Sequence, residues 1–270
     1  MWYYCNMDFE YILADPTGNI TVLVTSPYTE DTRSEIIRES FEREPSCEQV
    51  GFIMPVSDSA VKVEMMGYEF CGNATLSAAA WHALTHGLMP GGQTHVTVDS
   101  SGAASLLDVK ISRLADRSGH PASIGTVCMP VPSASTFRGY PLVQFDGISH
   151  LLVPAGRWDD EEAEQAVRSF ADELGVPALG MMLCPEYDSL VSGSPDSGCL
   201  NIRPLVYVPS SQTLFWEKGC ATGSTAVGWY RCSLDASHTH TEIKQPGGVI
   251  RVDVTGGQPF LTGTVVLLSL

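Results

Sequence analysis

Basic residues are scarce in this sequence of 270 residues. Lys and Arg number 15 against 31 Asp and Glu, so the formal net charge is -16 at pH 7. Such a chain repels phosphate backbones and anionic membrane surfaces overall. We therefore expect neither a nucleic acid nor a membrane as a partner.

Long apolar runs are also missing. No stretch reaches the roughly 18 uncharged apolar residues of a membrane span, and the first residues lack the basic and apolar regions of a signal peptide. Hydrophobic residues make up 44% and charged residues 17%, which is typical of a globular chain and not of a disordered one. We expect a cytoplasmic protein with two domains of about 130 residues, although one large domain is also admissible.

Cysteine is too sparse for a disulfide scaffold. Eight cysteines make up about 3% of the chain, well below the density of secreted disulfide-rich domains, and no CxxC occurs. The histidines of the HTH at 238–240, and His82 and His86 on one predicted helix, do not repeat with zinc-ligand spacing. We predict free thiols and no metal site.

The order of apolar patterns predicts an α+β fold with many strands and few helices. Alternating or apolar runs predict strands at 20–24, 61–65 and 263–270, among others. Amphipathic spacing predicts helices over 31–43 and 159–174. An Ala-rich segment after Cys71 is a further helix candidate.

Two similar motifs lie 149 residues apart, counted from position 71 to position 220. The first is CGNATLSAAAW from Cys71, and the second is CATGSTAVGWY from Cys220. Each follows a predicted strand end and leads through small residues into a helix. A repeat of this length indicates two related halves, each with one cysteine at a helix start, facing each other across a cleft.

This duplicated helix start suits one kind of chemistry. Small residues let the first N–H groups of the helix approach a carboxylate, and the helix start lowers a thiol's pKa. Inverting a stereocentre without a cofactor needs one base on each face of the α-carbon. Negative charge that develops next to the held carboxylate is stabilised there. We therefore predict that Cys71 and Cys220 are the two bases.

Cysteine is often a packing residue, which is the alternative for either cysteine taken alone. The matching pair favours the functional interpretation. The other six cysteines lack the small-residue turn, and we assign them to the core or the surface: Cys5, Cys47, Cys128, Cys184, Cys199 and Cys232.

These motifs resemble those of the superfamily of diaminopimelate epimerases, proline racemases and phenazine-biosynthesis isomerases. CGNA is similar to the epimerase CGNG, and CATGS is similar to its second box, CGTG. With CEQVGFI at 47–53, LVYVP at 205–209 and QPGGVIRV at 245–252, nearly the whole chain resembles the histidine racemases of staphylopine-type metallophore biosynthesis.

The resemblance implies a fold of two pseudo-symmetric halves, each a curved, mostly antiparallel sheet around a central helix. Residues 1–118 with 258–270 would carry Cys71, and residues 119–257 would carry Cys220. The expected activity is racemisation of histidine, without a cofactor, for an opine-type metallophore. A small amino acid is the expected partner, and a homodimer is one option for the oligomeric state.

The resemblance also assigns substrate-binding residues. N–H groups at the two helix starts would hold the α-carboxylate, and Asn19 would help to orient the substrate. Glu217 would receive the ammonium group, unless it is an ordinary strand-end carboxylate. Glu48 and Gln49 would bind the imidazole, unless they form a solvated strand face. The helix-start residues are Gly72, Asn73, Ala221 and Thr222.

Lys218 departs from the epimerase pattern, which has Glu-Arg before its second box. Without that arginine, a bidentate clamp on a second carboxylate is lost, which favours a monocarboxylic amino acid. Three alternatives stay open: a racemase or epimerase of another amino acid, an isomerase of the phenazine-biosynthesis type, and a non-catalytic ligand-binding protein.

Overall fold

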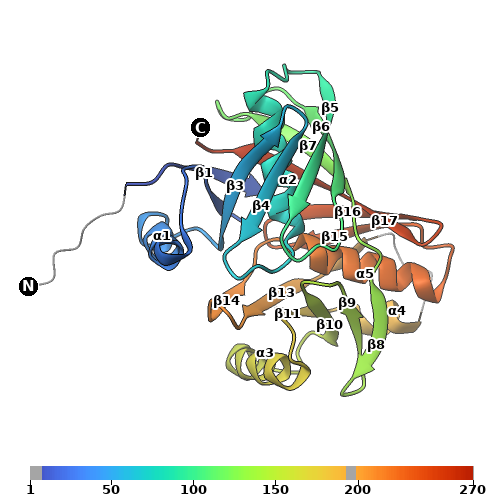
Figure 1. Cartoon of the computed structure of the whole chain (residues 1–270). Helices are drawn as coiled ribbons and strands as arrows, with labels where there is room; N and C mark the ends of the chain where they lie inside the picture. Colours follow the sequence, from blue (N-terminus) through green and yellow to red (C-terminus); the bar gives the residue numbers. More distant parts are fainter. Residues whose placement is uncertain (1–7, 193–198, 270) are drawn as a thin grey trace, which may run out of the picture.

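The computed structural model describes residues 8–192 and 199–269 of the chain (Figure 1). Strands dominate these residues, helices are few, and the sheets are mostly antiparallel, so the predicted α+β class is confirmed. Two sheets account for all the paired strands in the described part of the chain.

Eight strands of the larger sheet close on themselves, because β1 pairs with both β2 and β17. Two of the pairings, β2 with β3 and β4 with β5, are parallel. In order around the closed sheet, the strands are β1 (Tyr11–Pro16), β2 (Thr21–Val24), β3 (Gln49–Ser57), β4 (Ala60–Met65), β5 (Gln93–Ser100), β6 (Leu107–Arg113), β7 (Ala122–Cys128) and β17 (Gln258–Leu267).

Helix α2 (Gly72–Thr85) packs inside this closed sheet (Figure 1) and is buried along most of its length. Its sequence, GNATLSAAAWHALT, explains why the helix fits, because alanine adds little volume and has the highest helix propensity. Strand glycines make room as well: a Cβ at Gly125 would lie 2.8 Å from the Leu76 side chain. The small residues near Cys71 therefore serve the packing as well as the helix start.

The larger sheet continues beyond β17 into β16 (Gly248–Thr255), β15 (His240–Gln245) and β12 (Cys199–Asn201). The second sheet has six strands, in the order β14 (Thr213–Trp216), β13 (Arg203–Val208), β11 (Leu179–Cys184), β10 (Ser149–Pro154), β9 (Tyr140–Gln144) and β8 (Ser133–Phe137). Helix α5 (Ala221–Leu234) contacts β15, β16 and β17 on one side and β9 and β10 on the other.

The second helix is therefore enclosed differently from the first. Instead of a closed sheet of its own, α5 lies between an extension of the first sheet and the six-stranded sheet. The cause is that β17 is shared: it pairs with β1 and β7 as well as with β16. The division of the chain after residue 118 stays a prediction.

The remaining helices cover outer faces. Helix α1 (Glu30–Arg43) packs Ile36 against Val22, Val50 and Phe52 of the closed sheet. Helix α3 (Asp160–Leu174) covers the six-stranded sheet, and α4 (Tyr187–Ser192) contacts α5. Both predicted amphipathic helices are thus confirmed within a residue at each end.

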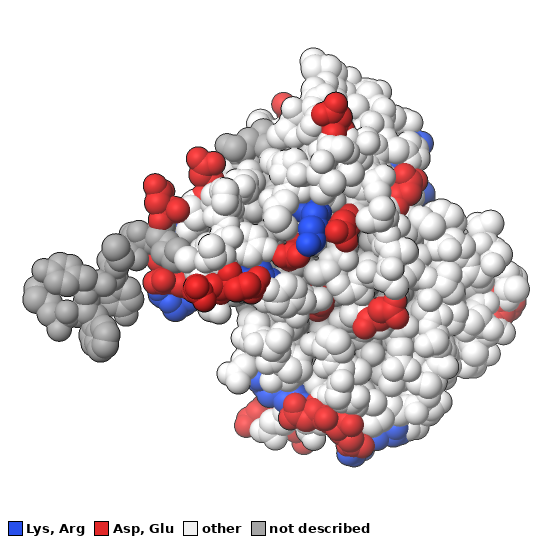
Figure 2. Space-filling model, in the orientation of Figure 1, with Lys and Arg blue, Asp and Glu red and all other residues white. Residues whose placement is uncertain are grey.

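Acidic side chains gather over α1 and α3 on the face drawn in Figure 2. This matches the excess of Asp and Glu in the sequence. In the described part of the chain, every helix is too short or too polar to span a bilayer.

Candidate active site

Cys71 and Cys220 occupy equivalent positions in the two halves. Each is the N-cap residue of its helix, with φ and ψ of -130° and 111° for Cys71 and -117° and 109° for Cys220. Each Sγ accepts a hydrogen bond from the N–H three residues later, at 3.4 Å from Ala74 N and from Gly223 N. The sequence repeat is therefore a repeat of local structure.

The starts of α2 and α5 contact each other directly. Asn73 Nδ2 donates to the Gly219 carbonyl oxygen at 2.6 Å. A Cβ added at Gly72 would lie 2.9 Å from the Ala221 Cβ, closer than such atoms approach in real structures. Glycine at position 72 thus allows the two helix starts to meet.

Both thiols face one cavity between the halves, with a volume of about 30 Å³. A buried water needs roughly 10–15 Å³ of such space, so the cavity has room for about two waters. Its lining comes from both halves and consists of Gln49, Glu69, Phe70, Cys71, Asn73, Ile148, Val206, Val208, Glu217, Cys220, Ala221 and Thr222.

Seven of the ten predicted site residues belong to this lining. The three that do not are Asn19, Glu48 and Gly72. Asn19 and Glu48 are buried behind the lining, and Gly72 lies at the contact between the helices. Their predicted contacts with a substrate stay predictions.

A chain of hydrogen bonds runs back from Cys71. Its thiol donates to Gln49 Oε1 at 2.9 Å, and the Gln49 amide donates to Asn19 Oδ1. Asn19 Nδ2 donates to Glu48 Oε2 at 3.0 Å, and the N–H of Lys218 donates to the same oxygen at 3.1 Å. The two halves are therefore joined behind the cavity, through Glu48.

Cys220 has a different set of neighbours. Its Sγ lies 3.6 Å from Thr222 Oγ1, within hydrogen-bond distance for sulfur, and Glu217 lines the cavity beside it. Its backbone N–H donates to Gln245 Oε1 at 2.6 Å, and Gln245 in turn donates to Ser224 at 2.9 Å. Cys71 thus donates to a neutral amide, whereas Cys220 lies next to the Thr222 hydroxyl and the Glu217 carboxyl group.

The expected lowering of the thiol pKa values at the helix starts is wrong for this structure. Burial raises the pKa of Cys71 and of Cys220 above their ordinary values, and the charge of Glu217 raises both further. The N–H groups of Ala74 and Gly223 oppose this shift but do not reverse it. Both thiols are therefore protonated at neutral pH, because desolvation outweighs the helix start here.

Three carboxyl groups lie around the thiols: Glu48 and Glu69 are buried, and Glu217 is partly buried. Burial raises the pKa of Glu217 to about 8, of Glu48 to about 7 and of Glu69 to about 6. The charges of Glu48 and Glu69 contribute to the shift of Glu217. Lys218 Nζ is 4.0 Å from Glu48 and opposes the shift there. Acidic side chains therefore outnumber basic ones around the cavity, and a cationic group bound there would lower their pKa values.

The sequence-based prediction missed several members of the site. Four are lining residues with apolar side chains: Phe70, Ile148, Val206 and Val208. Glu69 stands two residues before Cys71, where its closeness to the motif was an available signal. Gln245 lies in QPGGVIRV, a segment used only for the family resemblance, and no local pattern connects it with Cys220.

The other cysteines are placed as assigned, in the core or nearer the surface. Cys47 and Cys184 are buried, whereas Cys128, Cys199 and Cys232 are partly exposed. Cys5 lies outside the described residues. In residues 8–192 and 199–269, no cluster of three or more His, Cys, Asp or Glu side chains has a geometry that would hold a metal ion.

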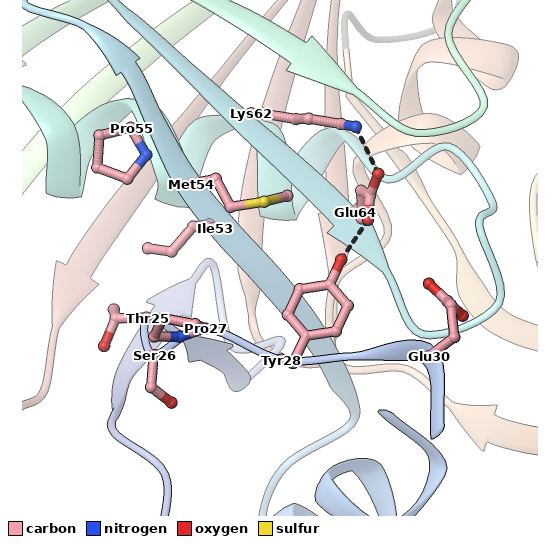
Figure 3. Close-up of a pocket in the computed structure, with 10 residues that line it drawn as sticks. All are labelled: Thr25, Ser26, Pro27, Tyr28, Glu30, Ile53, Met54, Pro55, Lys62 and Glu64. Carbon is pink, nitrogen blue, oxygen red and sulfur yellow. Dashed lines mark hydrogen bonds and ion pairs between the residues drawn. The ribbon is translucent and has the colours of Figure 1, made fainter. Parts of the chain in front are cut away.

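A larger cavity, of about 560 Å³, lies on the outside of β3 and β4 beside residues 25–30 (Figure 3). Its charged groups pair with each other: Glu64 accepts from the Tyr28 hydroxyl and binds Lys62 Nζ at 2.6 Å. None of the predicted site residues lines it. The smaller cavity between the helix starts is therefore the candidate active site.

Known proteins are similar to this chain in fold and in sequence. A solved structure of a predicted epimerase from Pseudomonas aeruginosa superposes with a TM-score of 0.66 at 15% identity, covering 97% of this chain and 98% of its own. A curated histidine racemase of Fusobacterium nucleatum is 25% identical over 96% of this chain and 95% of its own length. One of Staphylococcus aureus is 28% identical over 90% and 87%.

The duplicated helix starts, the shared cavity and these similarities define an isomerase of the amino-acid racemase class. The model of the family described as histidine racemase CntK N-terminal domain matches residues 8–266. This chain belongs to that family.

Proposed function

We propose that this protein interconverts L- and D-histidine without a cofactor, with Cys71 and Cys220 as the two bases. The observation that carries the proposal is that two cysteines, each the N-cap of its helix, line one cavity from opposite halves. A planar carbanion formed there has a thiol on each face, as inversion requires.

The helix starts provide the site for the α-carboxylate. The N–H groups of Gly72, Asn73, Ala221 and Thr222 stand in the first helical turns, where no acceptor within the helix is available. Four such donors from two helices would stabilise a carboxylate and the negative charge that develops beside it.

Glu217 is proposed to receive the α-ammonium group. Its carboxyl group lines the cavity beside Cys220 and has a pKa raised to about 8 by burial and by Glu48. An ammonium group placed there adds positive charge next to both thiols. That charge lowers their pKa values and makes a thiolate accessible near neutral pH.

The different neighbours of the two thiols suggest which one acts as the base in the resting enzyme. Glu217 lies beside Cys220, so an ammonium group bound to Glu217 favours the Cys220 thiolate, whose proton is released to solvent, whereas Cys71 donates to the neutral amide of Gln49. The Cys220 thiolate then takes the α-proton, and the Cys71 thiol gives its proton to the other face. After one turnover Cys220 is a thiol and Cys71 a thiolate, so the reverse reaction proceeds from the other cysteine.

Histidine is the proposed substrate because the curated relatives are histidine racemases and because the cavity has polar groups for a ring. Gln49 lines the cavity and donates one amide hydrogen to Asn19, which leaves the second for a ring nitrogen. Behind Gln49, the Glu48 carboxylate accepts hydrogen bonds from the Asn19 amide and from the N–H of Lys218. Because the cavity of about 30 Å³ is too small for an amino acid, the halves must separate when the substrate enters.

Incubation of L-histidine with the purified protein in deuterium oxide, without added cofactor, tests the proposal. We expect loss of optical rotation together with deuterium at the α-carbon. Cys71→Ser and Cys220→Ser should each lower the rate of racemisation by about 10²- to 10⁴-fold. Cys232→Ser, on the same helix as Cys220 but away from the cavity, is the matched control and should keep full activity.

The outcomes separate the alternatives. Exchange with another common amino acid but not with histidine would identify a racemase of different specificity. No exchange with any of them would overturn the proposal and leave a ligand-binding protein or a different isomerase. A binding protein would keep its affinity in both cysteine variants.

Three broader expectations are part of the proposal. Residues 1–118 with 258–270 form one half and residues 119–257 the other. The protein works in the cytoplasm, and the oligomeric state, with a homodimer as one option, is open. The D-histidine formed enters an opine-type metallophore pathway. This last expectation rests on the motif resemblance.

A further inference from the structure

Glu69 is a lining carboxylate that the proposed mechanism does not use. It lies in the connection between β4 and α2, two residues before Cys71, and is 4% exposed. Ser101 Oγ donates to the Glu69 carbonyl oxygen at 2.8 Å, and the N–H of Gly67 donates to its Oε2 at 2.9 Å. Hydrogen bonds therefore hold both the backbone and the side chain of Glu69.

Among the described residues, the hydrogen bonds to the Glu69 carboxylate come from its own connection, from the N–H groups of Gly67 and of Glu69 itself. No basic side chain in residues 8–192 and 199–269 forms an ion pair with it. A carboxylate has about four acceptor positions, so two stay available. By contrast, Glu217 is the proposed partner of the ammonium group, and Glu48 lies behind the lining.

The cavity wall near Glu69 is apolar. Val208 and Ser210 come close to it, since a Cβ on Gly67 would meet the Val208 side chain at 2.4 Å, Ser210 Oγ at 2.6 Å and Glu69 Oε2 at 2.9 Å. The Ser210 hydroxyl donates to the Gly67 carbonyl oxygen and is not part of the lining. Phe70, Ile148 and Val206 complete this part of the lining. Apolar surface with one hydrogen-bond acceptor suits a flat ring that carries an N–H group.

We propose that Glu69 determines the specificity of the site by accepting a hydrogen bond from a ring N–H of the substrate's side chain. The inference rests on the proposed function and extends it. Gln49 lines the same small cavity and offers a free amide hydrogen, so the two residues supply one acceptor and one donor. A neutral imidazole presents the matching pair, one N–H and one bare nitrogen.

The test compares L-histidine with 3-(2-thienyl)-L-alanine, whose ring has a similar shape but no N–H. Rates of α-deuterium incorporation are measured for the wild-type protein and for Glu69→Gln, with kcat and KM separated. In Glu69→Gln we expect KM for histidine to rise about tenfold or more, with a smaller change in kcat. The exchange of thienylalanine should stay the same, so that discrimination between the two substrates falls by the same factor.

Glu64→Gln is the matched control, because Glu64 lies on β4 close by in sequence but outside the cavity. It should leave discrimination unchanged. An equal loss for both substrates in Glu69→Gln would overturn the proposal, since a merely structural role predicts that result. If Glu69→Gln does not fold, Glu69→Asp keeps the charge but withdraws it from the ring, and the same loss of discrimination is expected.

Failure of the proposed function gives a different result. In that case the wild-type protein exchanges the α-proton of neither substrate. If the wild-type protein exchanges histidine but discrimination is unchanged in every Glu69 variant, only the role of Glu69 is refuted.

Discussion

Replacing Glu217 by glutamine removes a partly buried carboxyl group that lies beside two other carboxyl groups. Burial raises the pKa of Glu217 from its ordinary value of 4.5 to about 8, and Glu48 contributes as well. Glutamine has nearly the same shape but carries no titratable group. The variant should therefore be more stable than the wild type at neutral pH, although it loses the group proposed to bind the substrate's ammonium.

The sign and size of this change in stability follow from the difference in the pKa of Glu217 between the folded and unfolded states. The folded protein keeps the Glu217 proton up to a pH of about 8, whereas the unfolded chain releases it near pH 4.5. This group therefore lowers the free energy of unfolding as pH rises through that window, by at most about 1.4 kcal/mol per pH unit. At pH 7 the full effect is about 3 kcal/mol. Because Glu217 keeps some solvent contact, we expect about 1.5 to 3 kcal/mol.

Thermal unfolding of both proteins between pH 4.5 and 9 measures the effect. At pH 7 the variant should melt roughly 3–5 °C higher than the wild type. The difference should be small at pH 4.5, grow with pH and level off above pH 8. Asp172→Asn, at an exposed position on α3, is the control and should show no such growth. A difference that does not change with pH would refute the reasoning.

The remaining predictions concern the helix starts. Alkylation of Cys220 by iodoacetamide at pH 7.5, followed by mass spectrometry, should be much slower than that of a free cysteine and should speed up with rising pH, because burial raises its pKa. Gly72→Ala should destabilise the fold by about 1–3 kcal/mol in denaturant unfolding, because the new Cβ would lie 2.9 Å from Ala221 Cβ. The residual racemase activity of this folded variant should be low. Asn73→Ala should cost about 1–3 kcal/mol by the same assay, because the buried Gly219 carbonyl loses its donor at 2.6 Å. Rapid alkylation of Cys220 at pH 7.5, or unfolding midpoints unchanged in both variants, would contradict these expectations.

The local features of this protein were predictable from its sequence. Cys71 and Cys220 are followed by small residues, and both begin helices, because N-cap geometry and helix propensity act over a few neighbouring residues. The helix over 160–174 begins at Asp159, whose carboxylate accepts from Glu162 N at 2.9 Å, and ends at Gly175 with a positive φ of 62°. Such signals need no tertiary contact to be recognised.

The composition of the site depended on contacts between distant residues. Asn73 meets Gly219 across 146 positions, and the N–H of Lys218 reaches Glu48 across 170. The register of β17 against β1 and β7 brings these segments together, and no local pattern specifies that register. For the same reason the contact of Gln245 with Cys220 could not be recognised from their neighbours in sequence.

The protonation of the thiols was also decided by the tertiary structure. A helix start lowers a thiol's pKa when it acts alone, and the sequence indicated only that contribution. Folding added burial and the charge of Glu217, which outweigh the N–H groups and raise the pKa of both thiols. The sequence by itself thus determined which cysteines stand at helix starts. Only the three-dimensional arrangement determined what surrounds them, because desolvation and charge act through space and not along the chain.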